Sequence, residues 1–549
     1  MRRILLTSAL PYANGSIHLG HLVEYIQTDI WSRFQKMQGH EVYYICADDT
    51  HGTPVMLRAE KEGMAPTELI RIIHEEHSND FVKFLIDFDF FGSTNNNQTQ
   101  QIANDIYRKL KEKTNLIVEK TIEQFFDPEK LMYLPDRYVK GTCPKCEAKD
   151  QYGDSCEKCG ATYSSTDLLE PTSSLTGLKP TRKKTSHYFF RLSDPQCSVF
   201  LRDWVEKDGR LQSEARNKVR EWFEAGFIDW DITRDAPYFG FEIPDAPDKF
   251  FYVWLDAPIG YFGSFKEFCE NQDIDFESFV SEPEATNKKT ELIHFIGKDI
   301  LYFHALFFPA ILRFSGYRTP SAIYAHGFLT VNGQKMSKSR GTFITAAQYV
   351  SAGLDPEWLR YYYFAKLNSS LQDIDLNVDD FRQKVNSDLV GKYINIASRS
   401  SKFINKYFKN VLADSISHTL LETMKSQESI ISNQYENREY SKALKNIMYL
   451  ADSVNQFIDR EKPWKLAGVD NKRLHEICTI ALEAFRLLTL YLKPVLPSTA
   501  KRVEEFLRIP EMSWNDVNYK MESQHEINKY HHLIKRVTEA DMDKISPID

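Results

Sequence analysis

The beginning of the chain carries the pattern that most limits the possible folds, which is a strand, a turn, a helix and a second strand. Residues 3–10 (RILLTSAL) are short and apolar, as expected of a buried strand, and the turn PYANG follows directly. Apolar residues then recur at helical spacing from Ile17 to Met37, and Gly39 suits the end of a helix. Residues 40–48 (HEVYYICAD) predict the second strand. A βαβ unit of this kind predicts a parallel sheet.

The rest of the chain divides by composition, and its 549 residues favour three to four structural units. Residues from about 116 to 229 hold a cysteine cluster, a Ser/Thr/Pro-rich stretch and a basic patch, and we interpret them as an insertion. The apolar segment 291–297 (ELIHFIG) predicts a further strand, so the sheet is expected to be split in the sequence. Beyond residue 380 the apolar spacing is helical almost throughout, which predicts an all-α bundle.

Overall composition excludes several classes of protein. Hydrophobic residues make up 42% and charged residues 27%, as in ordinary globular chains, and the net charge of −8 excludes a histone-like protein but not nucleic-acid binding. No uncharged apolar stretch reaches the roughly 20 residues that span a bilayer, since even Phe250 to Phe265 contains Asp256. The apolar start ends at a polar turn, unlike a signal peptide. We therefore expect a cytoplasmic protein with no membrane segment.

Four of the eight cysteines form a compact pattern of two CxxC pairs separated by nine residues. They are Cys143, Cys146, Cys156 and Cys159. Four thiolates at this spacing suit one tetrahedral Zn²⁺, whereas a redox-active CxxC would need only one pair. Four protein ligands leave no open coordination position, so we expect a structural metal. The other four cysteines are scattered and are interpreted as small buried side chains: Cys46, Cys197, Cys269 and Cys478.

Two histidines follow the first predicted strand in His18-Leu19-Gly20-His21. Backbone N–H groups and the positive end of a helix dipole make this turn a site for a phosphate, and Gly20 leaves room for a flat base. A second motif, Lys335-Met336-Ser337-Lys338-Ser339-Arg340, combines cations and hydroxyls on a loop, which suits a polyphosphate clamp. Alone, the first would be read as incidental surface histidines and the second as a solvated basic loop. Their joint occurrence in this order favours the functional interpretation.

With these motifs in place, the sequence resembles the methionyl-tRNA synthetases, a family of class I aminoacyl-tRNA synthetases. That class carries a HIGH-type motif after the first strand of a Rossmann-like domain and a KMSKS loop after the last. Here these are His18 to His21, with Leu at the second position, and Lys335 to Ser339. The wider matches are ALPYANGSIHLGH at 9–21, CADDTHGTP at 46–54 and VNGQKMSKSRGT at 331–342, and the resemblance extends from residue 3 to about 510.

The resemblance implies a two-step reaction. Methionine attacks the α-phosphate of Mg-ATP to give methionyl-adenylate, and a terminal ribose hydroxyl of tRNA(Met), initiator or elongator, then takes the acyl group. The protein mostly positions reactants and stabilises charge. His18 and His21 would stabilise the transition state, and Lys335 and Lys338 the departing pyrophosphate. The ATP site would comprise His18, Gly20, His21, Lys298, Asp299 and Lys338.

A methionine pocket should be rich in aromatic groups, because a thioether favours aromatic edges. Aromatic residues in an apolar segment are by default core residues. By resemblance, Asp49 would hold the substrate ammonium group and Arg234 the carboxylate or the ATP phosphates. The remaining pocket residues implied by the family are Ala9, Leu10, Tyr12, Trp254, Ala257, Pro258, Tyr261, Ile300 and His304. Taken alone, His304 would be read as a satisfied core histidine.

The resemblance also implies anticodon-reading residues, namely Asn395 and Arg399, four apart on one helix face, and Trp464. From spacing alone they would be read as helix capping and surface packing. The predicted fold is α/β: a Rossmann-like parallel-sheet catalytic domain with a zinc-knuckle insertion, followed by an all-α helical-bundle anticodon-binding domain. The expected division is 1–115 and 230–330 for the two halves of the catalytic domain, 116–229 for the insertion with its knuckle at about 140–162, 331–385 for the KMSKS loop and stem-contact region, and 386–549 for the bundle with its tail.

The sequence disfavours other synthetases, a small nucleotidyltransferase and a non-catalytic protein. Isoleucyl, valyl and leucyl enzymes need a larger editing insertion, and a cysteinyl enzyme places its zinc in the active site. A small HxGH nucleotidyltransferase would lack the loop, the knuckle and the bundle. A non-catalytic RNA-binding or scaffold protein would not be expected to keep both histidines and both signature lysines. Because the sequence ends at Asp549 after a mixed-charge tail, without a further OB-fold domain, we expect a monomer.

Overall fold

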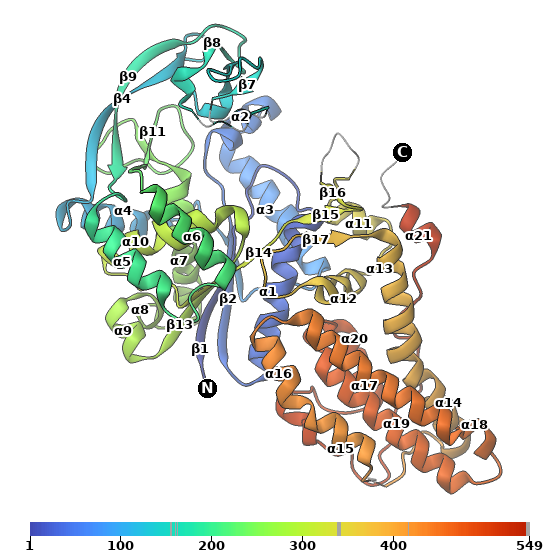
Figure 1. Cartoon of the computed structure of the whole chain (residues 1–549). Helices are drawn as coiled ribbons and strands as arrows, with labels where there is room; N and C mark the ends of the chain where they lie inside the picture. Colours follow the sequence, from blue (N-terminus) through green and yellow to red (C-terminus); the bar gives the residue numbers. More distant parts are fainter. Residues whose placement is uncertain are drawn as a thin grey trace.

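The computed structural model describes residues 1–153, 156, 158–159, 161, 163–336, 342–414 and 417–544. A five-stranded parallel sheet in the order β14-β13-β1-β2-β3 forms the centre of the amino-terminal region (Figure 1). The strands are β1 (Arg3–Ser8), β2 (Glu41–Asp48), β3 (Phe90–Ser93), β13 (Thr290–Gly297) and β14 (Ala322–His326). The strands predicted at 3–10, 40–48 and 291–297 are confirmed, and so is the split of the sheet in the sequence.

The strand order determines where a site can form. From β1 the chain adds β2 and β3 on one side, whereas β13 and β14 pair on the other side of β1. In open α/β sheets, ligands bind at the carboxyl edge where the strand order reverses, because the connections leave in opposite directions and open a crevice. The segments after β1 and after β13 therefore meet at this edge.

Both faces of the sheet are covered, which explains the continuous apolar runs of its strands. Ile4 and Leu6 pack with α1 (Leu19–Met37) in one buried cluster, whereas Leu5 faces a second cluster with α7 (Val253–Gln272) and α4 (Asn97–Glu112). Helix α1 lies between the sheet and the helices α12 (Pro356–Lys366) and α16 (Glu428–Glu436). The helix that begins at the histidine pair is thus also the core contact to the carboxyl-terminal part of the chain.

The inserted segment leaves the sheet on a long antiparallel ribbon of β4 (Ile117–Asp127) and β9 (Thr181–Phe190). Its tip carries the cysteine segment and lies far from the central sheet (Figure 1). The tip has a small apolar core of its own, formed by Phe125, Leu134, Val139 and Leu168. The following helices, α5 (Pro195–Glu206) and α6 (Ser213–Ala225), instead pack into the second apolar cluster beside the central sheet.

Helices dominate the carboxyl-terminal part, as predicted. They are α14 (Asn395–Phe408), α15 (Thr419–Ser426), α16, α17 (Tyr440–Glu461), α18 (Pro463–Leu466), α19 (Asn471–Leu492) and α20 (Pro497–Leu507). A three-stranded sheet of β15 (Leu329–Val331), β16 (Gln334–Lys335) and β17 (Ile374–Leu376) precedes them, together with α11 (Ala346–Ser351), α12 and α13 (Val378–Lys384). The last described helix, α21 (Glu539–Asp543), returns to α13. Among the described residues, no helix combines the length and apolar composition needed to cross a bilayer.

Candidate active site

The two histidines cap the first turn of α1. The His21 backbone N–H donates to His18 Nδ1 at 3.3 Å, and the His18 backbone N–H donates to His21 Nδ1 at 3.4 Å. Their rings stack with centroids 3.5 Å apart. Burial, followed by the neighbouring His18, lowers the pKa of His21 to about 3, so this imidazole is neutral near pH 7. Because Nδ1 accepts a bond in each ring, a neutral ring carries its hydrogen on Nε2, where it can donate to a phosphate.

The flank of the KMSKS motif is hydrogen-bonded to this same turn. The Leu19 N–H donates to the Ile344 carbonyl at 3.0 Å, and the Ala346 N–H donates to the Ile17 carbonyl at 2.8 Å. A Cβ atom on Gly20 would lie only 2.9 Å from His18 Cε1 and 3.2 Å from Met336 Sδ, which explains the glycine. Lys335 ends β16 nearby in the sequence. Lys338 lies outside the described residues. The two motifs, distant in sequence, are thus joined by their flanks.

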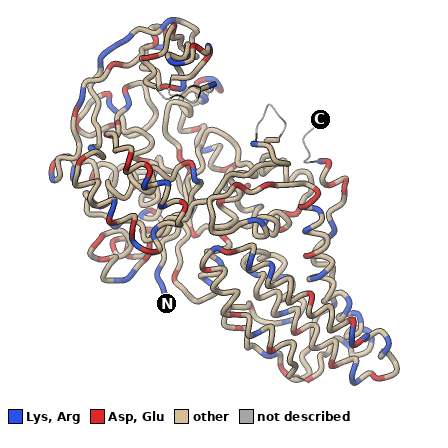
Figure 2. The backbone as a smooth tube through the Cα atoms, in the orientation of Figure 1, with Lys and Arg blue, Asp and Glu red and all other residues tan. Residues whose placement is uncertain are grey.

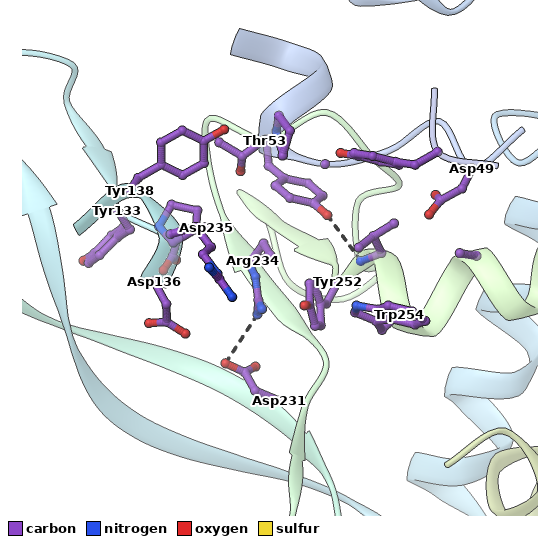
Figure 3. A pocket seen from close by; sticks show the side chains of 18 of the residues that line it. Asp49, Thr53, Tyr133, Asp136, Tyr138, Asp231, Arg234, Asp235, Tyr252 and Trp254 are labelled. Atoms are coloured by element: carbon purple, nitrogen blue, oxygen red, sulfur yellow. Dashed lines mark hydrogen bonds and ion pairs between the residues drawn. The ribbon is translucent and has the colours of Figure 1, made fainter. Parts of the chain in front are cut away.

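A pocket of about 770 Å³ opens at the carboxyl edge of the sheet (Figure 3). Ten of the eleven predicted methionine-site residues line it: Leu10, Tyr12, Asp49, Arg234, Trp254, Ala257, Pro258, Tyr261, Ile300 and His304. Ala9 is not among the lining residues. Its N–H donates to the Phe295 carbonyl at 3.1 Å, and its carbonyl accepts from the Tyr25 hydroxyl at 2.9 Å, so Ala9 holds β1 to its neighbours beside the pocket.

One end of the pocket is aromatic and apolar. Trp254 stacks on Phe303 with ring centroids 3.7 Å apart and planes within 6°. The hydroxyl of Tyr261 lies 3.0 Å from His304 Nε2, and His304 Nδ1 lies 3.1 Å from the Ile300 carbonyl oxygen. Since a carbonyl only accepts, the neutral His304 donates from Nδ1 and accepts from Tyr261. Burial lowers the pKa of His304 to about 4. Such a wall suits an uncharged, polarizable group such as a thioether.

The other end of the pocket is polar. Asp49 is partly buried, and its buried Oδ1 has no hydrogen-bond partner among the described residues. Burial, together with nearby Asp256, raises its pKa well above the ordinary value, so a bound cation would stabilise the ionised carboxylate. The Arg234 guanidinium lies 3.5 Å from the centre of the Tyr252 ring, and its Nη1 is 3.6 Å from Asp231 Oδ2. Figure 3 shows Arg234 between these two side chains. The pocket therefore offers both charge signs to a zwitterion.

Lys298 and Asp299, predicted to serve ATP, lie directly after β13 and outside this pocket. The Lys298 ammonium is 2.6 Å from Asp373 Oδ1, and Asp299 is exposed. These residues are placed at the same edge of the sheet as the turn after β1. The structure thus separates the pocket from the surface near α1 where the histidine pair lies.

The structure also identifies site residues that the sequence reasoning missed. Asp231, Asp235, Tyr238 and Tyr252 line the pocket beside Arg234, and their positions follow from the pairing of short strands that no periodicity marks. Behind them, the His51 Nδ1 and Asp256 Oδ2 atoms form a buried hydrogen bond, and Asp256 in turn acts on Asp49. A signal for Asp256 existed, because it is a carboxylate within an otherwise apolar run.

The four cysteines of the insertion come together, as predicted. Their sulfurs all lie within 4.8 Å of one another, with Cys143 to Cys159 at 3.9 Å and Cys146 to Cys156 at 3.5 Å. A tetrahedral zinc with Zn–S bonds of about 2.3 Å separates its sulfurs by about 3.8 Å. The Lys145 N–H also points to Cys143 Sγ at 3.4 Å, which stabilises a thiolate. The four cysteines can therefore hold one zinc ion.

The predicted anticodon residues lie at one end of the helical bundle. Asn395 begins α14, Arg399 lies one turn further along, and Trp464 is on α18. The Arg399 guanidinium is 5.3 Å from the centre of the Trp464 ring. Figure 2 shows Lys and Arg along this end of the bundle, mixed with acidic residues. The structure thus brings two of the three residues into contact and places the third on the same helix.

Comparison with known proteins agrees with this geometry. A parallel sheet with a histidine pair at its first turn and an aromatic pocket at its carboxyl edge is the core of a class I aminoacyl-tRNA synthetase. The family model described as "tRNA synthetases class I (M)" matches residues 4–401, and the model of the anticodon-binding domain of methionyl tRNA ligase matches residues 413–546. The chain belongs to the methionyl-tRNA synthetase family.

Individual relatives support this assignment. The chain is 57% identical to the methionine--tRNA ligase of Cupriavidus necator, covering 99% of this chain and 79% of the relative. It is 59% identical to that of Thiobacillus denitrificans, covering 98% and 77%. Among solved structures, the Mycobacterium tuberculosis methionyl-tRNA synthetase in complex with methionyl-adenylate has a TM-score of 0.79 at 23% identity, covering 97% of this chain and 99% of that one. The latter likeness concerns the fold.

Proposed function

We propose that this chain is a methionine–tRNA ligase, which activates methionine with ATP and transfers it to the 3′ end of tRNA(Met). The observation that carries the proposal is the pocket: ten residues expected from the family line one cavity, with an aromatic end and a zwitterion-binding end. Family membership supports the reaction class.

In the proposed mechanism, Asp49 binds the ammonium group of methionine and Arg234 binds its carboxylate. The side chain then reaches Trp254 and the hydrogen-bonded pair of Tyr261 and His304, where water is excluded. The thioether of methionine requires no hydrogen bond. The uncharged wall therefore favours methionine over an amino acid with a polar side chain of similar length. Binding at both ends of the pocket orients the carboxylate oxygen of methionine for attack on the α-phosphate of ATP.

We assign stabilisation of the phosphate charge to the histidine pair. His18 and His21 would donate from Nε2 to the phosphate in the transition state, and Gly20 would allow the adenine ring to approach. Lys335 and Lys338 would neutralise the departing pyrophosphate, while Lys298 and Asp299 would contact ATP. Mg²⁺ would enter with ATP and neutralise its phosphates. No step requires a covalent enzyme intermediate.

The insertion and the helical bundle also receive proposed roles. We propose a structural zinc at Cys143, Cys146, Cys156 and Cys159, and anticodon reading by Asn395, Arg399 and Trp464. The division into 1–115, 116–229, 230–330, 331–385 and 386–549 is proposed as the functional organisation. A cytoplasmic location agrees with the need for reduced thiolates as zinc ligands. The expectation of a monomer rests on the sequence alone, and sedimentation at micromolar concentration tests it.

The decisive experiment is amino-acid-dependent ATP–pyrophosphate exchange with all twenty amino acids and Mg²⁺. We expect exchange with methionine alone, followed by charging of tRNA(Met) in a second assay. Exchange with another amino acid would keep the reaction but overturn the pocket assignment. An absence of exchange from folded, zinc-loaded protein would overturn the proposed function and favour a non-catalytic RNA-binding role.

A further inference from the structure

His77 connects two parts of the site that the mechanism uses separately. It lies on α3 (Pro66–Lys83) and is fully buried. Its Nδ1 is 2.6 Å from Asp48 Oδ1, and its Nε2 is 2.8 Å from the carbonyl oxygen of Gly15. Asp48 is the last residue of β2 and directly precedes Asp49, whereas Gly15 lies in the turn that leads to His18. One imidazole therefore spans the two segments.

The partners of the ring determine its charge. A carbonyl oxygen only accepts, so Nε2 must carry a hydrogen. An ionised carboxylate also only accepts, so the bond to Asp48 requires a second hydrogen on Nδ1. His74 Nδ1 lies 2.8 Å from the other oxygen of Asp48, so imidazoles face both oxygens of this carboxylate. An imidazolium at position 77 satisfies Asp48 and Gly15 at once, whereas a neutral ring donates to only one of them.

We propose that His77 is a positioning residue for adenylate formation, which as an imidazolium fastens the turn before His18 to the carboxyl end of β2. It would thereby fix the histidine pair relative to Asp49, the proposed ammonium-binding residue. This inference rests on the proposed function of the site. His77 is not among the residues that line the pocket, and its hydrogen bond to the turn is to the Gly15 carbonyl, so we expect it to act through the backbone of the turn.

The surroundings of His77 agree with a positive charge. The titratable groups that face it are Asp48 on β2, His21 on α1, and His74, Glu76 and Asp80 on its own helix. Helices α2 (Thr53–Glu62) and α11 also pack against α3. Helix α2 does so through the apolar cluster of Val55, Ala59, Leu69, Ile70 and Ile73, its Arg58 and Glu60 are paired with Glu62 and Lys130, and α11 has no charged residue. Burial lowers the pKa of His77, but the hydrogen bond and charge of Asp48 and the bond to Gly15 outweigh it, and the pKa is raised. His77 in turn contributes, after burial and His18, to the lowered pKa of His21.

The hydrogen bonds of His77 to Asp48 and to the Gly15 carbonyl can be removed separately. In His77→Asn the side-chain amide nitrogen can take the place of Nδ1 and bind Asp48, but it is too short to reach Gly15. In His77→Gln the amide nitrogen can take the place of Nε2 and bind Gly15. His74→Gln is the matched control, because His74 binds the same carboxylate but has no contact with the turn. Each variant is made in the full chain and tested for its thermal midpoint, its methionine Kd and its kcat in methionine-dependent exchange.

We expect His77→Asn to lower kcat at least about tenfold, because a misplacement of about 1 Å can cost a hundredfold. The methionine Kd should change less than about threefold, His77→Gln should recover part of kcat, and His74→Gln should resemble the wild type. The inference is overturned if folded His77→Asn keeps the wild-type kcat, or if His77→Gln and His77→Asn lose activity equally. A wild type without exchange would instead refute the proposed function.

The charge state of His77 has its own test, which starts from the wild-type protein. In wild-type protein with ¹⁵N-labelled histidine, both ring nitrogens of His77 should show the shifts of protonated nitrogen at neutral pH. Because its pKa is raised, the charged form should be complete below the ordinary value of about 6.5 and should be lost as the pH rises through the raised value. The kcat of exchange should fall as the pH rises over the same range. In His77→Gln this decrease of kcat with pH should be absent. A neutral ring at pH 7 would overturn the inference.

Discussion

The guanidinium of Arg399 lies 5.3 Å from the centre of the Trp464 ring, although the two residues belong to different helices. Arg399 is also held by Asp459, at 2.8 Å between Nη2 and Oδ1. Trp464 remains 45% exposed despite this contact. A fixed planar cation beside an exposed indole is an arrangement on which an unstacked base can stack and be read at its edge.

Replacing Trp464 by Ala should separate the two half-reactions. Stacking of a base on an aromatic side chain contributes about 1–3 kcal/mol, so kcat/KM for tRNA(Met) charging should fall about tenfold to a hundredfold. Methionine-dependent ATP–pyrophosphate exchange should be unchanged. Trp464→Phe keeps an aromatic face and should retain most of the charging activity. A parallel loss of exchange and charging would show that Trp464 is structural.

The fold was predictable where local pattern and burial agree. Ile447 and Ile477 recur at helical spacing and are buried on α17 and α19, as the spacing predicts. The strands β1, β2 and β13 are apolar because both faces of the sheet are covered. The short strands near Arg234 were not predictable, because β11 (Thr233–Asp235) and β12 (Lys249–Phe251) are fixed by pairing between segments rather than by their own sequence.

The candidate site was predictable where resemblance supplied positions and where metal spacing is specific. The four cysteines meet as their spacing predicts. The buried residues behind the pocket and the histidine turn were harder to predict. No spacing pattern marks His77 or Asp256, and each becomes informative only when its partner is known. Asp48 shows the same limit, since its contacts come from a helix that begins 18 residues later in the chain.

Lys338→Ala should slow adenylate formation far more than it weakens methionine binding. A cation that acts on charge developing in the transition state contributes to kcat, and removing one such donor costs about a hundredfold to a thousandfold. Pre-steady-state adenylate formation gives the rate, and equilibrium binding gives the methionine Kd. Lys335→Ala should act in the same direction, whereas Lys288→Ala changes an exposed lysine far from the motif and should have no effect. Unchanged activation in Lys338→Ala would exclude the clamp role.

Removal of one zinc ligand should abolish metal binding. Cys146→Ser leaves three thiolates, so the zinc content by elemental analysis should fall from about one equivalent per chain to near zero. The tip of the insertion should then unfold at a lower temperature, since its own apolar core is small. Cys269→Ala replaces a buried cysteine outside the cluster and should leave the zinc content unchanged. Retention of a full equivalent by Cys146→Ser would contradict the four-thiolate site.

His304 should make stability depend on pH. Burial lowers its pKa from the ordinary value of about 6.5 to about 4, so the unfolded chain binds a proton more readily than the folded chain. The free energy of unfolding should therefore fall as the pH drops from 6.5 to 4, by up to roughly 3 kcal/mol from this residue. Urea unfolding at several pH values measures it. His304→Gln should flatten this dependence, while His531→Gln, at an exposed position, should not. Equal slopes in the wild type and His304→Gln would contradict the assignment.

Replacement of Arg360, a buried residue outside the site, should destabilise the fold. Its Nη2 is 2.5 Å from Asp29 Oδ2, and both side chains are fully buried. The same guanidinium donates to the carbonyls of Pro494 at 3.0 Å and Val495 at 2.9 Å, after α19. Because Asp29 lies on α1, the helix that starts at the histidine pair, Arg360 connects the catalytic region to the helical bundle.

Arg360→Met should lower the free energy of unfolding by about 3–5 kcal/mol, because it leaves a buried carboxylate and the carbonyls of Phe84, Leu85, Pro494 and Val495 without this donor. Asp29→Asn should also destabilise, and the double variant should lose less than the two single variants together, since both remove one interaction. Arg508→Met removes an exposed ion pair with Glu526 and should cost less than about 1 kcal/mol. If thermal and urea unfolding of Arg360→Met match those of Arg508→Met, the buried pair does not stabilise the junction. A loss of stability without a change in methionine-dependent exchange at 25 °C would show that the junction supports the fold rather than the chemistry of activation.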